Sequence, residues 1–227
     1  MTILTPLDWA ALAFFVTAWL GYGLVIEHGR FAHRTLNGAM HGFREHWMER
    51  MLAREVRIVD TQIMASLQNG TAFFASTSLL AVGGSLALLR SADDVVRVVG
   101  DLPIGLESSR AAWELKGIGL ALIFVYAFYK FAWSYRLFNY AAILLGGTPP
   151  REEAGTPAAQ AHVRRTARMT TAAGRHFNRG QRAFFFALGY LGWFLSPVVL
   201  VVSTVAVLIV MAMRQFRSDG HDAALDR

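Results

Sequence analysis

The sequence predicts an all-α integral membrane protein with four transmembrane helices and one amphipathic helix on the cytoplasmic side. Two observations carry this prediction. Of the 227 residues, 54% are hydrophobic and 17% are charged, and the apolar residues are concentrated in long runs without charge. The basic residues are concentrated in particular connecting segments, which assigns those segments to one side of a membrane. Residues 1–227 are expected to form a single membrane domain in contact with the lipid bilayer.

Four segments are long and apolar enough to span, since about 20 helical residues cross the hydrocarbon core. The first follows Pro6, which suits a helix start, and no signal-peptide pattern surrounds it. The fourth has no charged residue, and Pro197 is expected to kink it. The helical pattern of the third continues to Leu145. The four spans are expected at about residues 7–26, 63–89, 113–135 and 183–213.

The charges between the spans predict the orientation. There are 15 basic and 7 acidic residues in segments 27–62 and 136–182 together with Lys130. The rest of the chain, including the polar tail at 214–227, has 7 basic and 9 acidic residues. Cytoplasmic loops carry an excess of Arg and Lys, so we expect 27–62 and 136–182 in the cytoplasm and both termini on the other side. The preference for Arg over Lys, with abundant Ala and Gly, indicates a bacterial chain in the inner membrane.

The segment before the second span has helical spacing of apolar residues. Met40, Phe43, Trp47 and Met51 form one row, and a second row continues to Ile63. Charged residues occupy the other directions. We expect an amphipathic helix that lies on the membrane surface and runs into the second span, with lining of the mouth of an assembly as the alternative.

A row of arginines lies on one face of the helix predicted before the fourth span. Such a stripe suits anionic lipid headgroups, and a bound anionic metabolite or an acidic partner is the alternative. Gly174 and Gly180 leave the continuity of this helix open. The candidate lipid-binding residues are Arg164, Arg168, Arg175, Arg179 and Arg182.

The second span is more polar than the others, and its polar and small residues recur on one side. Helix packing explains such a row, because small residues permit close approach and hydroxyls form hydrogen bonds between helices. A hydrated path in a homo-oligomer explains it as well. The candidate path-lining or packing residues are Ser66, Asn69, Phe73, Ser76, Thr77 and Gly84.

The sequence contains no motif that dictates a reaction. Without cysteine it can form no thiolate zinc site and no iron–sulfur cluster. His41, Glu45 and Glu49 share a helical face and are weak metal candidates, but their spacing misses the known zinc motifs. We therefore expect no enzymatic activity and no cofactor. The net charge of +6 reports loop orientation in a membrane chain, so we expect no nucleic-acid partner.

Lys130 is the only ionisable residue well inside a predicted span. Near the cytoplasmic end of that span it can snorkel out of the hydrocarbon, or it lies at the headgroups if the helix extends past Arg136. The sequence leaves both placements open.

Two stretches carry a resemblance to a known family. They read Arg57-Ile-Val-Asp60-x-Gln62 and Asn69-Gly-Thr-Ala-Phe-Phe-Ala-Ser-Thr-Ser-Leu-Leu80, preceded by the helix with Trp47-Met48. In them the chain resembles an uncharacterised membrane family of bacteria and plants, the domain of unknown function 599, from the first span to the fourth. The resemblance implies a four-span membrane protein and supplies no catalytic residues.

Two functions from different classes remain open. The first is a non-enzymatic membrane protein that self-associates through the second span and forms an ion or small-solute path. The alternative is a structural or regulatory membrane subunit that binds anionic lipid or a membrane protein partner.

Overall fold

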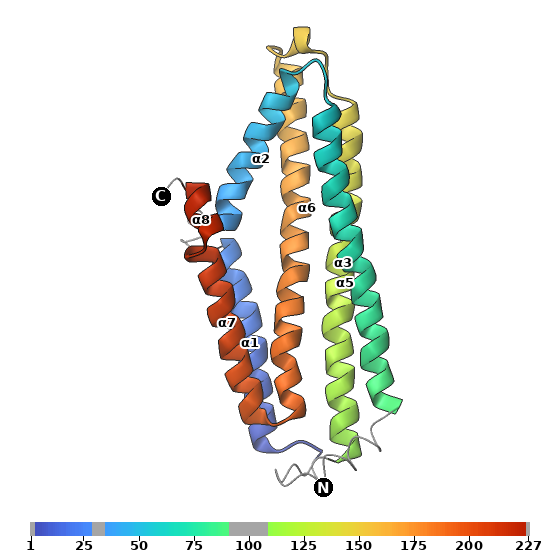
Figure 1. The fold of residues 1–227 in the computed structure, drawn as a ribbon, viewed down its shortest axis with the longest axis vertical. Helices are drawn as coiled ribbons and strands as arrows, with labels where there is room; N and C mark the ends of the chain where they lie inside the picture. Colours follow the sequence, from blue (N-terminus) through green and yellow to red (C-terminus); the bar gives the residue numbers. More distant parts are fainter. Residues whose placement is uncertain (1–2, 29–34, 91–108, 226–227) are drawn as a thin grey trace.

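The chain folds into an elongated bundle of helices (Figure 1). The computed structural model describes residues 3–28, 35–90 and 109–225, and these residues contain no β-strand. Short 3-10 turns follow α5 and α6 at Arg151–Glu153 and Leu191–Phe194. The helices are α1 (Pro6–His28), α2 (Leu36–Leu52), α3 (Ile58–Arg90), α5 (Arg110–Gly146), α6 (Pro157–Tyr190), α7 (Pro197–Phe216) and α8 (Asp219–Leu225).

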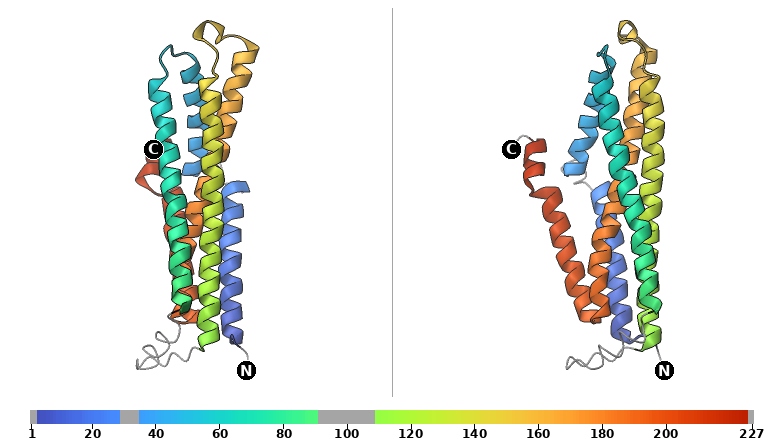
Figure 2. Two further views of the ribbon diagram at one scale, coloured as in Figure 1. Left: turned by 90° about the vertical axis from the view of Figure 1, so that its right-hand side faces the viewer. Right: turned by 45° about the vertical axis from the view of Figure 1, so that its right-hand side comes forward.

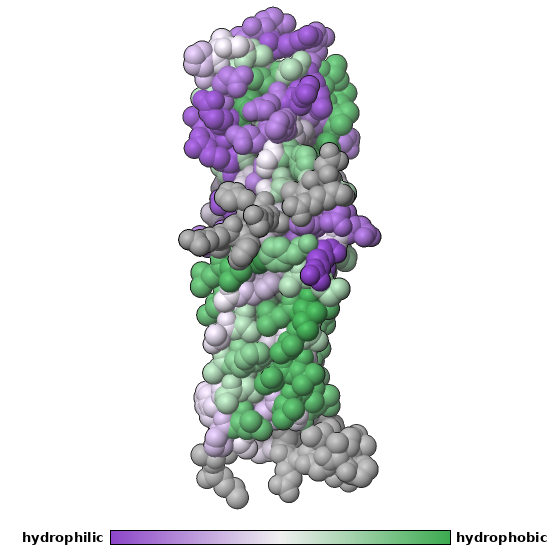
Figure 3. All heavy atoms as spheres, turned by 90° about the vertical axis from the view of Figure 1, so that its left-hand side faces the viewer, coloured by the Kyte–Doolittle hydropathy of each residue, from purple (hydrophilic) through white to green (hydrophobic). Residues whose placement is uncertain are grey.

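The bundle has an apolar half and a polar half (Figure 3). The apolar half contains α1, α7 and the lower parts of α3, α5 and α6, whereas the polar half contains α2, the upper parts of α3, α5 and α6, and the turn after α5 (Figure 1). Four helices, α1, α3, α5 and α7, are long and apolar enough to cross a membrane. With 37 residues, α5 is about 55 Å long, well beyond the hydrocarbon thickness of about 30 Å. The long helices therefore extend past the bilayer, and the predicted fold class is confirmed.

The predicted fourth span, residues 183–213, is wrong as a single helix. α6 ends at Tyr190, a 3-10 turn follows, and α7 begins at Pro197 with Ser196 as its N-cap. The Ser196 hydroxyl accepts a hydrogen bond from the amide of Val199 at 3.1 Å. Proline lacks an amide hydrogen and has a helix-compatible φ, so at the first helical position it starts a helix instead of kinking one. The chain reverses here, and α6 and α7 form an antiparallel hairpin (Figure 2).

This hairpin also separates the two ends of the described chain along the bundle, whereas the side of the membrane on which each terminus lies stays a prediction. The start of α1 and the end of α7 lie at opposite ends of the apolar half (Figures 1 and 2). The end of α7 meets the start of α2, where the amide of Asn37 donates to Oε1 of Gln215 at 3.4 Å. Ala183 to Tyr190, predicted as the start of the fourth span, belong instead to α6, which lies along α7 in the lower part of the bundle (Figure 1).

The amphipathic helix is present, but it neither lies flat nor runs into the second span. α2 ends at Leu52 and stands along α6, which covers the apolar residues of its last turns, whereas Met40 and Phe43 of the predicted row are exposed. This packing explains the difference, because the apolar residues that meet a helix partner no longer require a bilayer surface. The buried cluster contains Met48, Met51 and Leu52 of α2 with Ala159, Val163 and Ala167 of α6.

Small residues set the close packing of the long helices. The buried face of α3 repeats every seven residues, and its hydroxyls donate to carbonyls of their own helix, as Thr71 does to Leu67 at 2.7 Å. α6 continues through Gly174 and Gly180, which settles the question that these glycines raised. A Cβ atom at Gly180 would lie 2.7 Å from the ring of Phe131 on α5, so this crossing depends on glycine. Besides Asp60 near its start, the buried α3 residues are Met64, Thr71, Ser78 and Ser85.

A buried polar cluster ties α1 to the hairpin at the far end of the apolar half. Trp193 Nε1 donates to Asp8 Oδ1 at 2.7 Å, and the Thr5 hydroxyl donates to Asp8 Oδ2 at 2.7 Å. Lys116 of α5 is buried nearby, with its Nζ atom 5.5 Å from the centroid of the Trp193 ring. Asp8 thus lies in the first turn of α1 and also holds the turn after α6.

Candidate functional site

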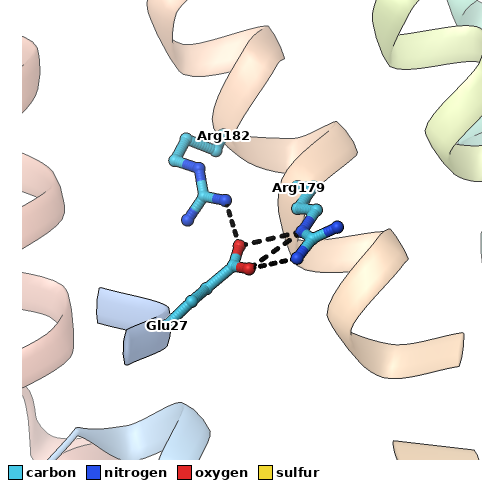
Figure 4. A network of polar contacts seen from close by, with 3 residues as sticks. All are labelled: Glu27, Arg179 and Arg182. Carbon is cyan, nitrogen blue, oxygen red and sulfur yellow. Dashed lines mark hydrogen bonds and ion pairs between the residues drawn. The ribbon is translucent and has the colours of Figure 1, made fainter. Parts of the chain in front are cut away.

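The candidate site is built around an acidic residue at the end of α1. Glu27 forms ion pairs with Arg179 and Arg182, which lie about one turn apart on α6 (Figure 4). The Nε atom of Arg179 lies 3.0 Å from each carboxylate oxygen of Glu27. Only 9% of the Arg182 side chain and 15% of the Glu27 side chain are exposed. Charge-assisted hydrogen bonds of this kind are stronger than neutral ones, and those that Arg179 donates to Glu27 raise the pKa of Arg179 above its ordinary value.

More positive charge surrounds this network than Glu27 can balance. The Nζ atom of Lys130 lies 4.9 Å from the centroid of the Tyr126 ring, beside the Glu27–Arg179 pair. From α2, the Arg44 guanidinium packs on Gly174, where a Cβ atom would lie 2.7 Å from a guanidinium nitrogen. Burial lowers the pKa of Arg44. The positive side chains around Glu27 are Arg44, Lys130, Arg175, Arg179 and Arg182.

Two cavities meet at the Glu27 network. The first, of about 590 Å³, is an open groove between α1, α5 and α6, which we call the amphipathic groove. Apolar side chains such as Trp19, Leu20 and Leu122 line its lower part, and Glu27 and the arginines border its upper end. Its full polar border is Glu27, His28, Tyr126, Arg179 and Arg182.

The second cavity, of about 520 Å³, lies between the end of α1, the start of α2 and the middle of α6. We call it the polar cavity. Arg182, Glu27 and His28 border both cavities, whereas Arg175 and His41 line the polar cavity and not the groove. Burial, followed by the charges of Arg44 and Arg175, lowers the pKa of His41. The other polar side chains of its lining are Thr35, Asn37 and Asn178.

The groove and its border suit an amphipathic anion. A negative headgroup can meet the guanidinium groups at the upper end while an apolar chain lies along α1 and α5. Of the described residues that line the two cavities, Glu27 is the only acid. The site therefore keeps a positive charge after its internal ion pairs are formed.

The predicted arginine stripe divides between two environments. Arg164, Arg168 and Arg175 are exposed, whereas Arg179 and Arg182 turn toward α1 and pair with Glu27. Sequence analysis missed Glu27 as their partner. The only available signal was an acidic residue directly after the first predicted span.

The residues proposed to line a path or a packing surface face outward from the bundle. Ser66, Asn69, Ser76 and Gly84 are exposed and Thr77 is half-buried, while 66% of Phe73 is exposed. They lie on a different face of α3 from the residues that pack on α5. The fold of one chain does not bring them together with another helix.

The weak metal candidates do not form a site in the described residues. No group of three or more His, Asp or Glu side chains in residues 3–28, 35–90 and 109–225 is placed to hold a metal ion. His41 faces the polar cavity near two arginines, and Glu45 and Glu49 are exposed. The positive surroundings of His41 oppose a bound cation.

A family model described as "Protein of unknown function, DUF599" matches residues 10–220. The chain belongs to this family. No curated protein and no solved structure matches the chain. DUF599 membership agrees with the sequence resemblance and with the four helices that can span a membrane.

In this DUF599 protein the residues that carried the resemblance near position 57 have a structural role. Asp60 is fully buried and accepts hydrogen bonds from Trp47 Nε1 at 2.7 Å and from Arg54 at 2.6 Å. The guanidinium of Arg57 donates to the carbonyl of Thr148 at 2.9 Å, in the turn after α5. The motif thus fastens α2, α3 and that turn together at the tip of the polar half.

Proposed function

We propose that this DUF599 protein is a non-enzymatic integral membrane protein that binds an anionic lipid in the amphipathic groove. The supporting observation is that Arg179 and Arg182, beside Glu27 near the end of α1, border an open groove whose other lining is largely apolar. One carboxylate, Glu27, offsets only one of these two charges. Basic residues near a membrane surface contribute on the order of 1 kcal/mol each toward anionic lipids.

The charge distribution supports a polar half in the cytoplasm of a bacterial cell. With the tail at 214–227 moved to the polar side, that side holds 18 basic and 10 acidic residues, against 4 and 6 on the other side. The resulting net charges are +8 and −2. They equal those of the arrangement in which residues 183–213 form one span, because the tail holds three Arg and three Asp. The excess of Arg and Lys follows the positive-inside tendency and supports an inner-membrane location.

Lipid retention in nanodiscs tests the proposed function. The full chain is reconstituted with phosphatidylcholine and phosphatidylglycerol, and bound lipids are identified by native mass spectrometry. We expect preferential retention of phosphatidylglycerol and a loss of roughly tenfold in that preference for Arg179→Gln, which removes a charge-assisted hydrogen-bond donor. Arg168→Gln is the matched control, since Arg168 is exposed on the same helix and lines neither cavity. Equal retention of both lipids by the unaltered protein contradicts the proposal.

A second candidate function is an ion or small-solute path in a homo-oligomer. The outward-facing row on α3 supports it, because polar and small side chains such as Asn69 and Ser76 are available to a second copy. The mass of the protein in nanodiscs, after subtraction of lipid and scaffold, decides whether a defined oligomer exists. If it does, Ser76→Phe is expected to reduce solute flux when the row lines a path and to disrupt assembly when it is a packing surface.

A further inference from the structure

The polar cavity contains a positive charge, that of Arg175, which the amphipathic groove lacks. Arg175 lines it and forms no ion pair within the described residues. Arg182 reaches it from the shared border, where Glu27 also binds Arg179. Together, Arg175, Arg179, Arg182 and Glu27 have a net charge of +2. Arg44 on α2 adds a further positive charge near His41.

The start of α2 adds to the positive potential. Thr35, Asn37 and Gly38, in the cap and first turn of this 17-residue helix, line the cavity. The Thr35 hydroxyl and Gln215 already accept from the amides of Gly38 and Asn37. The helix therefore contributes the field of its dipole and not free amide donors.

We infer that the polar cavity binds a phosphate monoester group, held by Arg175 and Arg182 with His41 and Asn178 beside it. A dianion matches the two uncompensated positive charges, and guanidinium groups bind phosphate oxygens in pairs of parallel hydrogen bonds. A volume of about 520 Å³ admits such a group with a small organic substituent. The inference does not depend on lipid in the groove, because Arg175 and His41 do not line the groove.

Two sources can supply this group. A lipid with a phosphate monoester head can place the head in the polar cavity and its chains in the groove, because Glu27, His28 and Arg182 border both spaces. A free phosphate compound can instead enter from the polar side. The recognition chemistry is the same in both cases.

His41 reports on occupancy of the cavity. The charged and titratable groups around it are Arg44 on α2, Arg175 and Arg182 on α6, and Glu27 and His28 on α1. Burial and the nearby arginines lower the pKa of His41, so the imidazole is neutral at neutral pH. A bound dianion reverses the sign of the local field, and we expect the imidazole to take up a proton when phosphate binds.

The first experiment uses inorganic phosphate and the full chain in phosphatidylcholine nanodiscs. Equilibrium dialysis measures binding, and NMR of labelled histidine follows the pKa of His41. We expect saturable binding that raises the pKa of His41, and an affinity roughly tenfold lower for Arg175→Gln. Arg168→Gln, at an exposed position on the same helix that lines neither cavity, is expected to bind phosphate within about twofold of the unaltered protein, a smaller change than the loss of one charge-assisted hydrogen bond produces.

The second arm replaces part of the phosphatidylcholine with phosphatidic acid or phosphatidylglycerol. Retention of phosphatidic acid that inorganic phosphate displaces identifies a lipid headgroup as the source. Phosphate binding without a preference for phosphatidic acid identifies a free phosphate compound. Absence of binding in both arms, or unchanged binding by Arg175→Gln, overturns the inference. Failure of the proposed function appears separately, as an unchanged preference for phosphatidylglycerol in Arg179→Gln.

Discussion

Glu27 is the residue whose charge both holds the bundle together and limits ligand binding. It offsets positive charge on α6 at the common border of the two cavities. An anion in either cavity meets the guanidinium of Arg182, which borders both. Stability and anion binding are therefore linked through one carboxylate.

Replacement of Glu27 by Gln is expected to lower stability by about 3 kcal/mol, because it leaves the buried guanidinium of Arg182 without a counter-charge. Thermal unfolding in a neutral detergent measures this loss. Added phosphatidylglycerol should restore more stability to Glu27→Gln than to the unaltered protein, since it supplies the missing negative charge. Glu45→Gln, at an exposed position on α2, is the control. It should change neither the stability in detergent nor the gain in stability from phosphatidylglycerol. A variant that melts like the unaltered protein would show that the ion pairs contribute little.

Two half-buried histidines, His41 and His176, give the protein a dependence on pH. Burial comes first among the causes that lower the pKa values of His41 and His176, and neighbouring cations add to it. The unfolded chain binds these protons near pH 6.5, whereas the folded chain binds them only at lower pH, so stability is complete above about pH 6.5 and is lost as pH falls below it. We expect the melting temperature to fall between neutral and mildly acidic pH, and less so in the His41→Gln, His176→Gln double variant. His46→Gln, at an exposed position, should behave like the unaltered protein.

At the residue scale, the sequence predicted which arginines share a helical face but not what they meet. Helical spacing relates positions within one element, so Arg179 and Arg182 were found together. Glu27 lies 152 residues before Arg179, and only the packing of α1 on α6 brings them together. The polar cavity was beyond sequence analysis for the same reason, since three separate elements line it.

At the scale of elements, glycine decides how closely α5 and α6 approach. Gly180→Ala would place a methyl group against the Phe131 ring, which cannot shift freely in the aromatic cluster with Phe74 and Phe177. We expect a loss of roughly 1–3 kcal/mol from this overpacking, despite the better helix propensity of alanine. Gly70→Ala is the matched control, because nothing lies within 4 Å of its added Cβ atom. In thermal unfolding, the melting temperature of Gly70→Ala should equal or exceed that of the unaltered protein. A similar gain in the melting temperature of Gly180→Ala would contradict the close crossing of α5 and α6.

The helical hairpin shows what hydropathy can miss in an element. The uncharged run from Ala183 to Met213 has the composition of a span, and composition does not record a change of direction. The sequence does contain a local signal for the start of a new helix within this run. Ser196 followed by Pro197 is a pattern typical of a helix start, in which the hydroxyl caps the first turn and proline needs no amide partner.

At the scale of the whole molecule, the reversal after α6 places the two ends of the described chain at different levels of the bundle. α1 begins at the far end of the apolar half, while α8 lies beside the start of α2 (Figure 1). The charge counts do not separate this arrangement from one with both ends on one side, because the tail carries equal numbers of Arg and Asp. The side on which α8 lies must therefore be measured directly.

The chain contains no cysteine, so single cysteines can report their own side of the membrane without a background. Three exposed positions mark the two sides: Glu55 at the tip of the polar half, Asp219 in α8 and Ser109 before α5. In cells with the outer barrier removed, a maleimide that cannot cross the membrane should label Ser109→Cys. Glu55→Cys and Asp219→Cys should react only after the membrane is opened, because both lie on the polar side that the charge excess assigns to the cytoplasm. Labelling of Asp219→Cys together with Ser109→Cys would instead require a single passage through residues 183–213 and would separate α8 from α2.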